Sequence, residues 1–191
     1  VAEGAAIAES DPAFGQQTLL AYKYGQLIQV SSELIADTGI DLLGYLGRAS
    51  GLGLGQASGT HFVTGTGTGQ PEGVQTNVTV GKTGTTGQTT TVIADDLFDL
   101  YHSIVSGYRS RGFWFTLDAS LAKIRKLKDT TNQYLWQPGL AQGTPDSLLG
   151  RPVVTDPNVP VMAANAKSIL FGDFSAYYAI RDVSAVRFER S

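Results

Sequence analysis

The strongest constraint on how this chain can fold is the placement of its glycines. Glycine supplies 23 of the 191 residues, and 11 of them lie in the 42 residues from Ser50 to Thr91. A helical spacing of apolar residues predicts a helix just before this stretch: Leu42, Leu43, Leu46 and Ala49. The same helix contains five glycines, each costing about 1 kcal/mol relative to Ala: Gly44, Gly47, Gly51, Gly53 and Gly55. Such a helix needs packing along most of its length, with glycines letting another backbone come close.

The segment before this helix is predicted to be an extended arm. Thr18–Val30 alternates loosely between apolar and polar residues. Upstream, Asp11-Pro12 has turn chemistry, because proline fixes φ and the aspartate can bond neighbouring amides. A protruding hairpin is therefore expected, of which the tip and the second strand are present. Thr38-Gly39-Ile40-Asp41 fits a capping pattern, so we expect Thr38 to begin the helix.

A glycine-rich region follows the helix and contains two predicted loops. Gly65–Gly73 predicts a tight loop, and the threonine-rich run Thr83–Thr91 predicts an exposed loop or hairpin. A flexible linker is the simpler alternative, but four valines between and beside these loops favour strands: Val74, Val78, Val80 and Val92.

The second half of the chain has the pattern of an α+β lobe. Asp95 or Asp96 opens a predicted helix, Phe113–Leu117 is a short buried strand, and Asp118 or Ser120 caps a second helix. The apolar face of the first helix is formed by Leu97, Leu100, Tyr101, Ile104, Val105 and Tyr108. Further strands are predicted at Tyr134–Trp136, Pro152–Thr155, Ser168–Phe171 and Tyr177–Arg181.

Composition excludes several kinds of chemistry. The chain has no cysteine, so it has neither disulfides nor a thiolate nucleophile or ligand. His61 and His102 are its only histidines, and no metal-binding motif surrounds them. With 14 basic and 17 acidic residues the formal charge is -3, which leaves no basic footprint for dedicated nucleic-acid binding.

Motifs for nucleotide binding and hydrolysis are absent from the sequence. In Gly65–Gly69 the third glycine comes one residue too early for a dinucleotide fingerprint, and Pro71 follows. Gly81-Lys82-Thr83 resembles the end of a phosphate-binding loop, but its first glycine position holds Thr76. The sequence contains no Gly-x-Ser-x-Gly elbow.

Two sets of charged residues, one acidic and one basic, have a simpler interpretation than catalysis. Glu33, Asp37 and Asp41 are spaced four residues apart, which favours a solvated or inter-subunit face with a helix-capping charge. Lys123, Arg125, Lys126 and Lys128 are expected to form a solvated helix face. We therefore predict no catalytic, cofactor-binding or metal-binding residues and no cofactor.

The ends of the sequence suggest a piece of a longer protein. The chain begins at Val1, no signal peptide is visible, and the longest uncharged stretch is too polar for a membrane span. Val186–Glu189 alternates like a half-buried strand and then stops two residues later. A natural short edge strand at the C-terminus is the alternative.

Five segments, in this order, resemble the major capsid proteins of tailed bacteriophages. The first looks like the entry to that family's long spine helix, the second like the loop after it, and the third like its axial-domain helix and loop. Together they span nearly all of the chain. They are Ser31–Asp37, Phe62–Gly73, Leu127–Asp129 with Tyr134–Pro138, Leu148–Val154 and Leu170–Phe174.

The resemblance implies an α+β fold of the tailed-phage capsid type. It has a hairpin arm, a peripheral domain built on a long spine helix, and an axial α+β domain. On this chain the arm remnant would be residues 1–30, the peripheral domain 31–91 and the axial domain 92–191. The fold would be incomplete at both ends, because the family begins with a further arm strand and ends with further strands.

The resemblance also implies a structural role without catalysis. Identical subunits would form pentamers and hexamers of an icosahedral shell enclosing double-stranded DNA without sequence-specific binding. Expected partners are a scaffold or maturation protease, portal and decoration proteins, with no membrane partner. The expected location is the virion capsid, assembled in the bacterial host cytoplasm. The loop at Tyr134–Gly139 would meet the capsomer centre.

Some family members join subunits by a lysine–asparagine isopeptide bond. The matching hairpin-tip position here is Ile7, which cannot form an amide, and the asparagine would lie past Ser191. Non-covalent contacts or decoration proteins are therefore expected to hold the shell. Two alternatives remain: an encapsulin-like compartment of the same fold, and a small α+β enzyme with a pocket containing His61 or His102.

Overall fold

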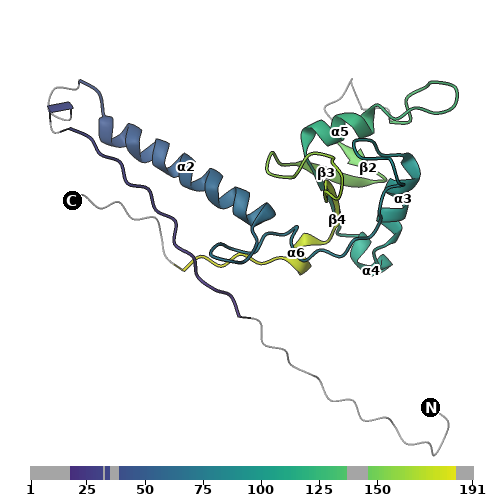
Figure 1. The fold of residues 1–191 in the computed structure, drawn as a ribbon, viewed down its shortest axis with the longest axis horizontal. Helices are drawn as coiled ribbons and strands as arrows, with labels where there is room; N and C mark the ends of the chain where they lie inside the picture. Colours follow the sequence, from purple (N-terminus) through teal and green to yellow (C-terminus); the bar gives the residue numbers. More distant parts are fainter. Residues whose placement is uncertain (1–17, 32, 35–38, 137–145, 184–191) are drawn as a thin grey trace, which may run out of the picture.

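The computed structural model describes residues 18–31, 33–34, 39–136 and 146–183. Figure 1 shows a lobe that carries the sheet and, beside it, a long helix with an extended segment running along it. The long helix is α2 (Leu42–Thr64), and the extended segment is residues 18–31, here called the arm. Figure 1 shows residues 18–31 as an extended segment, but no strand forms within them, so the second strand of the expected hairpin is not found there.

Helix α2 begins one turn later than the capping pattern predicts. Asp41 occupies the N-cap, and its Oδ1 accepts a 2.9 Å hydrogen bond from the Gly44 N–H. The prediction that Thr38 caps the helix is therefore wrong: aspartate is an equally good cap, and Asp41 lies directly before the first helical residue. Thr38 itself lies outside the described residues, as do the predicted hairpin tip and the strand at 186–189.

The lobe contains one four-stranded mixed sheet in the order β2-β3-β1-β4. Its strands are β1 (Phe113–Thr116), β2 (Ser147–Leu148), β3 (Arg151–Thr155) and β4 (Ile169–Gly172). The central strand β1 pairs parallel with β3 and antiparallel with β4, which places Trp114 opposite both Val153 and Phe171. Strand β2 pairs antiparallel with β3 at the edge.

Four helices accompany this sheet in the lobe: α3 (Ala94–His102), α4 (Ser106–Arg109), α5 (Asp118–Arg125) and α6 (Phe174–Tyr177). The predicted strands at 113–117, 152–155 and 168–171 and the two predicted helices are thus confirmed to within a few residues. The first helix is interrupted after His102, because the chain turns at Ser103 and restarts as the separate short helix α4.

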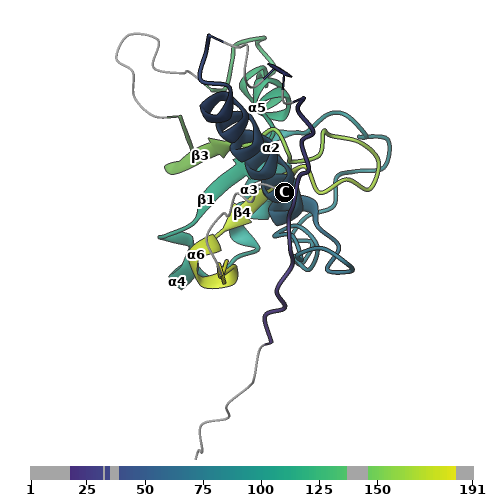
Figure 2. The ribbon, with the colours of Figure 1, turned by 90° about the vertical axis from the view of Figure 1, so that its left-hand side faces the viewer.

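Side chains alternate between the two faces of β1, so each face has its own core. On one face Trp114 packs with residues of α3, α5 and β4; this cluster is Leu97, Trp114, Ile124, Met162 and Phe171. On the other face Phe115 packs against a second cluster of Val63, Val159 and Leu170. Val63 is in the last turn of α2, so the second cluster joins the long helix to the sheet. Figure 2 shows α2 projecting in front of the sheet.

Three sets of predicted strands are wrong. The segments around Val74, Val78, Val80 and Val92 form turns and loops, because glycines and threonines beside them prevent a continuous ladder. Tyr134–Trp136 contributes one bridge, from Tyr134 to Lys128, instead of a strand. Tyr177–Arg181 is also not a strand: Asp173 caps α6 through Ala176 N, and the following residues find no sheet partner among those described.

Candidate assembly surface

Helix α2 is exposed along most of its length. Only Ser50 and Val63 are buried among its 23 residues. Large apolar side chains on it face solvent, with Leu43, Tyr45 and Leu52 each 65% exposed. A helix that packs so little against the described residues gains little tertiary stabilisation from them.

The glycines of α2 fall into two groups according to what a side chain there would meet. A Cβ added at Gly53 would lie 3.6 Å from the Gln26 side chain of the arm, and one at Gly59 would lie 3.6 Å from Asn158. At Gly47, Gly51 and Gly55 it would meet nothing within 4 Å. These three glycines are four residues apart and share one side of the helix. We call them the open glycine face; no contact within the described chain explains them.

The arm runs antiparallel to α2 and is held by two tyrosines. The Tyr24 hydroxyl and His61 Nδ1 form a 2.8 Å hydrogen bond, and the two rings lie 5.6 Å apart. The Tyr22 hydroxyl donates to the Gly67 carbonyl at 3.2 Å. Burial raises the pKa of the Tyr24 hydroxyl. Apolar residues on the same arm remain open, with Leu27 83% and Leu20 69% exposed.

The loop after α2 returns to cap the helix. The backbone N–H groups of Gly73, Val74 and Gln75 donate to carbonyls of the last helical turn and Gly65, at 2.8 to 3.1 Å. At the far end of the loop, Tyr178 donates through its hydroxyl to the Glu72 carbonyl at 2.7 Å. Burial first, and then the nearby Glu72 carboxylate, raises the pKa of Tyr178. Arm, helix, loop and the segment after α6 therefore meet at this place.

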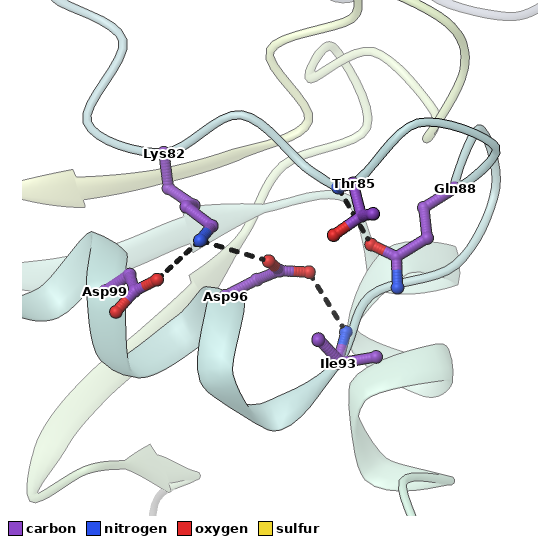
Figure 3. A network of polar contacts seen from close by, with 6 residues as sticks. All are labelled: Lys82, Thr85, Gln88, Ile93, Asp96 and Asp99. Carbon is purple, nitrogen blue, oxygen red and sulfur yellow. Dashed lines mark hydrogen bonds and ion pairs between the residues drawn. The ribbon is translucent and has the colours of Figure 1, made fainter.

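The threonine-rich segment after this loop lies against the start of α3 (Figure 3). The Lys82 ammonium forms ion pairs with Asp99, at 2.5 Å, and with Asp96, at 3.8 Å. Its hydrogen bond to Asp99 is the main reason that the pKa of Lys82 is raised. Asp96 also accepts from the Ile93 N–H, and Gln88 accepts from Thr85 N–H. The predicted exposed loop is confirmed, with its two ends fixed by polar contacts.

The two histidines serve different parts of the molecule. His61 contacts the arm, whereas His102 Nδ1 lies 3.1 Å from the Arg109 guanidinium in the lobe. Among the described residues no group of three or more histidines, cysteines or acidic residues is placed to hold a metal. An open hollow of about 370 Å³ is lined by Gln75, Thr76, Pro160, Asn165, Ala166 and Lys167, and so by neither histidine.

The charged groups of the sequence have more partners than expected. The basic face of α5 is not merely solvated: Lys123 Nζ donates to the Thr90 carbonyl at 2.8 Å, and Arg125 pairs with Asp146. Arg125 also lies over Trp136, and Lys128 over Tyr134, at 5.7 and 4.9 Å. Of the three spaced carboxylates, Asp41 caps α2, Glu33 is exposed, and Asp37 lies outside the described residues.

Sequence reasoning missed Tyr22, Tyr24 and Lys167 as contact residues. The two tyrosines stand two apart in an extended segment, which places them on one side of it and could have indicated a docking face. Nothing in the sequence around Lys167 indicates its partners, which lie about 90 residues away. The described helices contain none long and apolar enough to cross a bilayer.

Comparison with known proteins defines the class. The model of the phage capsid family matches residues 1–191 of the chain. This chain therefore belongs to the phage capsid family, and it is a structural capsid protein with the mixed α+β fold expected from its sequence.

Two solved structures are similar to it in fold. One is the capsid of the native GTA particle computed with C5 symmetry, at 28% identity and a TM-score of 0.66. The other is the capsid of the empty GTA particle, at 29% identity and the same TM-score. Each match covers 75% of this chain and 53% of the GTA chain, so the chain spans about half the length of these relatives. None of the curated proteins compared with the chain matches it.

Proposed function

We propose that this chain is the major capsid subunit of a phage or prophage. Copies of it assemble into pentamers and hexamers of an icosahedral shell that encloses double-stranded DNA. The observation that carries this proposal is helix α2, with two buried residues in 23 and an open glycine face. Since the described residues of the chain leave that helix largely uncovered, a neighbouring subunit is the partner that stabilises it. The similar GTA structures are capsids, which supports assembly of this chain into a shell.

The domain division expected from the sequence belongs to the same proposal. In this division residues 1–30 are the remnant of the hairpin arm, 31–91 the peripheral domain and 92–191 the axial domain. The separation of α2 and the arm from the sheet-bearing lobe supports this division (Figure 1). The exposed Tyr134 and Leu135, at the end of the lobe, are the proposed contacts at the capsomer centre.

The proposed role is structural and non-catalytic. The subunit is a homo-oligomer that works with a scaffold or maturation protease, a portal and decoration proteins. A formal charge of -3 suits a container that contacts packaged DNA weakly and without sequence preference. Because Ile7 cannot form an isopeptide bond, subunits are joined without covalent links. The subunit resides in the virion capsid after assembly in the host cytoplasm.

Electron microscopy of the full-length protein tests the assembly. Expressed alone and with its scaffold, it should form closed shells or ring-shaped capsomers in negative stain. A stable monomer under both conditions would contradict the proposal. Particles purified from the host should protect DNA from nuclease. Shells that hold protein cargo instead of DNA would favour the encapsulin-like alternative.

A further inference from the structure

Lys167 has an unusual set of partners for a lysine. Its Nζ lies within hydrogen-bonding distance of three backbone carbonyls, those of Gln75 at 3.1 Å, Thr76 at 3.2 Å and Val78 at 3.2 Å. An ammonium group has three donors and no acceptor, so these three bonds use its full capacity. In return, the Gln75 side-chain amide donates to the Lys167 carbonyl. We call this arrangement the Lys167 staple.

The carbonyls of the staple depend on a donor from elsewhere. Residues 75–78 form a turn and an irregular segment, so the ladder of a helix or sheet does not satisfy them. The bonds to Gln75 and Val78 are half-buried and the bond to Thr76 is exposed, and a hydrogen bond in a folded protein contributes about 0.5–1.5 kcal/mol. The ammonium of Lys167, the residue two before β4, brings its donors from about 90 residues further along the chain.

The staple links two segments that are each hydrogen-bonded to a different element: the loop after α2, bonded to the helix end, and the residues before β4, bonded to β1. On one side, Val74 and Gln75 donate backbone hydrogen bonds to Phe62 and Val63 of α2, at 2.8 and 3.1 Å. On the other, Ser168 follows Lys167 directly, and its carbonyl accepts from the fully buried Thr116 hydroxyl of β1 at 2.8 Å. A continuous path of polar contacts therefore runs from the end of α2 through Lys167 to the central strand.

Other contacts between α2 and the lobe constrain its direction less. Val63 packs in the second cluster, but apolar contacts have no directional preference. Thr60 donates to Asn158 through one exposed hydrogen bond of 2.8 Å. The staple combines three bonds to a single charged group, and hydrogen bonds to an ionised donor are stronger than neutral ones.

We propose that Lys167 is the positioning residue that sets the direction of α2 relative to the sheet. It does so by holding the segment that returns from the helix end against the start of β4. Its consequence for a shell rests on the proposed function: because α2 and the lobe would contact different neighbours, the angle between them determines how subunits curve in the assembly. Loss of the staple then broadens the range of that angle.

Chemical rescue tests the staple in the full-length protein. Lys167→Ala leaves three carbonyls converging on an empty position beside the open hollow that Lys167 lines. We expect its melting temperature to fall by about 4–8 °C. Ammonium or methylammonium chloride should restore much of this loss, whereas sodium or tetramethylammonium chloride at equal concentration should not. If Lys167→Ala folds only in ammonium buffer, its folding there supports the staple in the same way as a restored melting temperature.

Two variants provide controls. Lys123→Ala removes a lysine that donates to one carbonyl, that of Thr90, and should show no preference for ammonium over sodium. Lys167→Met fills the position with an apolar side chain and should be destabilised without rescue. Two results would contradict the role of the Lys167 staple. One is that ammonium and sodium chloride stabilise Lys167→Ala equally; the other is that Lys167→Ala is as stable as the wild type.

Particle assembly tests the consequence separately. Wild-type protein should form shells of uniform diameter, and Lys167→Ala should form shells of mixed diameter or open sheets, with uniformity returning in ammonium. Uniform shells from an unrescued Lys167→Ala would overturn the positioning role. Absence of any shell from the wild type would instead overturn the proposed function, while the rescue experiment would still decide whether the staple exists.

Discussion

Gly65 and Gly73 face each other across the loop that follows α2, and each leaves no room for a side chain. The Gly73 N–H donates to the Gly65 carbonyl at 2.8 Å. A Cβ at Gly73 would come within 2.5 Å of Gly65 N and Val63 O, while one at Gly65 would collide with the Pro71 and His61 carbonyls. All of these neighbours are backbone atoms, which cannot move aside as a flexible side chain does. This pair therefore fixes how the chain leaves the helix.

Replacing Gly73 with alanine should destabilise the subunit. Because the methyl group would overlap the backbone of Val63, the returning loop must shift and its hydrogen bonds to the helix end weaken. We expect a loss of about 1–3 kcal/mol in the free energy of unfolding, as for other overpacked sites. Thermal or urea denaturation measures it. Gly107→Ala in α4 is the control, since a Cβ there meets nothing within 4 Å; an equal loss in both variants would argue against the close approach.

Thr116→Val tests the buried link between β1 and the residue before β4. Thr116 is fully buried, and its hydroxyl donates to the Ser168 carbonyl at 2.8 Å. Valine keeps the shape but cannot donate, so the variant should lose about 1–3 kcal/mol of unfolding free energy. Thr116→Ser keeps the donor and loses one methyl group, about 0.8 kcal/mol. Denaturation curves should rank the wild type above serine and serine above valine; a valine variant as stable as the serine variant would contradict the role of the hydroxyl.

The elements of the lobe could be predicted because their local patterns agree with their environment. Phe113–Thr116 is a short aromatic and β-branched run, and it becomes the central strand with alternating burial. Tyr177–Arg181 has a similar composition, but the capping aspartate at 173 starts a helical turn first. The valines after α2 likewise find no partner strand within the part of the chain that the structure describes. In both segments the local preference for a strand was not realised, because a strand also needs a pairing partner and, at Tyr177, the cap of α6 favoured a helical turn.

The assembly surface could be predicted only in part. Five glycines in a predicted helix indicate that its stability comes from outside, and at three of them a Cβ would meet no atom of the described residues within 4 Å: Gly47, Gly51 and Gly55. The contacts that orient the helix could not be predicted. Lys167 binds carbonyls about 90 residues away, and carbonyls carry no sequence information about their donors.

Asp173 should make stability depend on pH in the acid range. Its Oδ1 accepts from the Ser175 hydroxyl at 2.5 Å and the Ala176 N–H at 3.3 Å, and its Oδ2 lies 3.1 Å from Arg111 Nε. The Ser175 hydrogen bond above all, helped by Ala176 and Arg111, lowers the pKa of Asp173, although burial opposes this. A carboxylate with a lowered folded pKa contributes stability above its unfolded pKa, about 3.9, and loses it as pH falls through the folded value.

Melting temperatures of Asp173→Asn measured between pH 7 and pH 3 check this dependence. The variant should be less stable than the wild type at pH 6, and the difference should shrink as pH falls below about 4. Asp95→Asn removes an exposed carboxylate that accepts no hydrogen bond among the described residues, and it controls for the loss of one charge. A difference between Asp173→Asn and the wild type that stays constant over the whole range would exclude Asp173 as the source.

Tyr24→Phe should loosen the arm without unfolding the lobe. Phenylalanine retains the ring beside His61 but loses the 2.8 Å hydrogen bond to Nδ1. The bond contributes about 0.5–1.5 kcal/mol, enough to raise the open population of the arm several-fold. Trypsin cleavage after the exposed Lys23 should quicken, while cleavage within the lobe keeps its rate. Unchanged cleavage in the arm would show that Tyr22 or other contacts suffice to hold it.

The open glycine face of α2 provides the sharpest distinction between a lone subunit and a shell. Gly51→Ala and Gly55→Ala add methyl groups where nothing in the described chain lies within 4 Å. Alanine favours the helix over glycine by about 0.5–1 kcal/mol per residue, so each variant should raise the stability of the unassembled subunit. If a neighbouring backbone covers this face in the shell, the same methyl groups should block its approach. The double variant should therefore melt at a higher temperature as a subunit and yet assemble poorly.

Gly53→Ala is the matched control, because it lies on the same helix but faces Gln26 of the arm at an ordinary contact distance of 3.6 Å. It should gain similar helix stability and assemble as the wild type does. Denaturation of unassembled subunits and sedimentation of assembly reactions measure the two effects independently. The open glycine face is a surface where subunits meet if the double variant Gly51→Ala with Gly55→Ala gains subunit stability but loses assembly. Gly53→Ala should gain stability without losing assembly. Normal assembly of the double variant would show that this face stays uncovered in the particle.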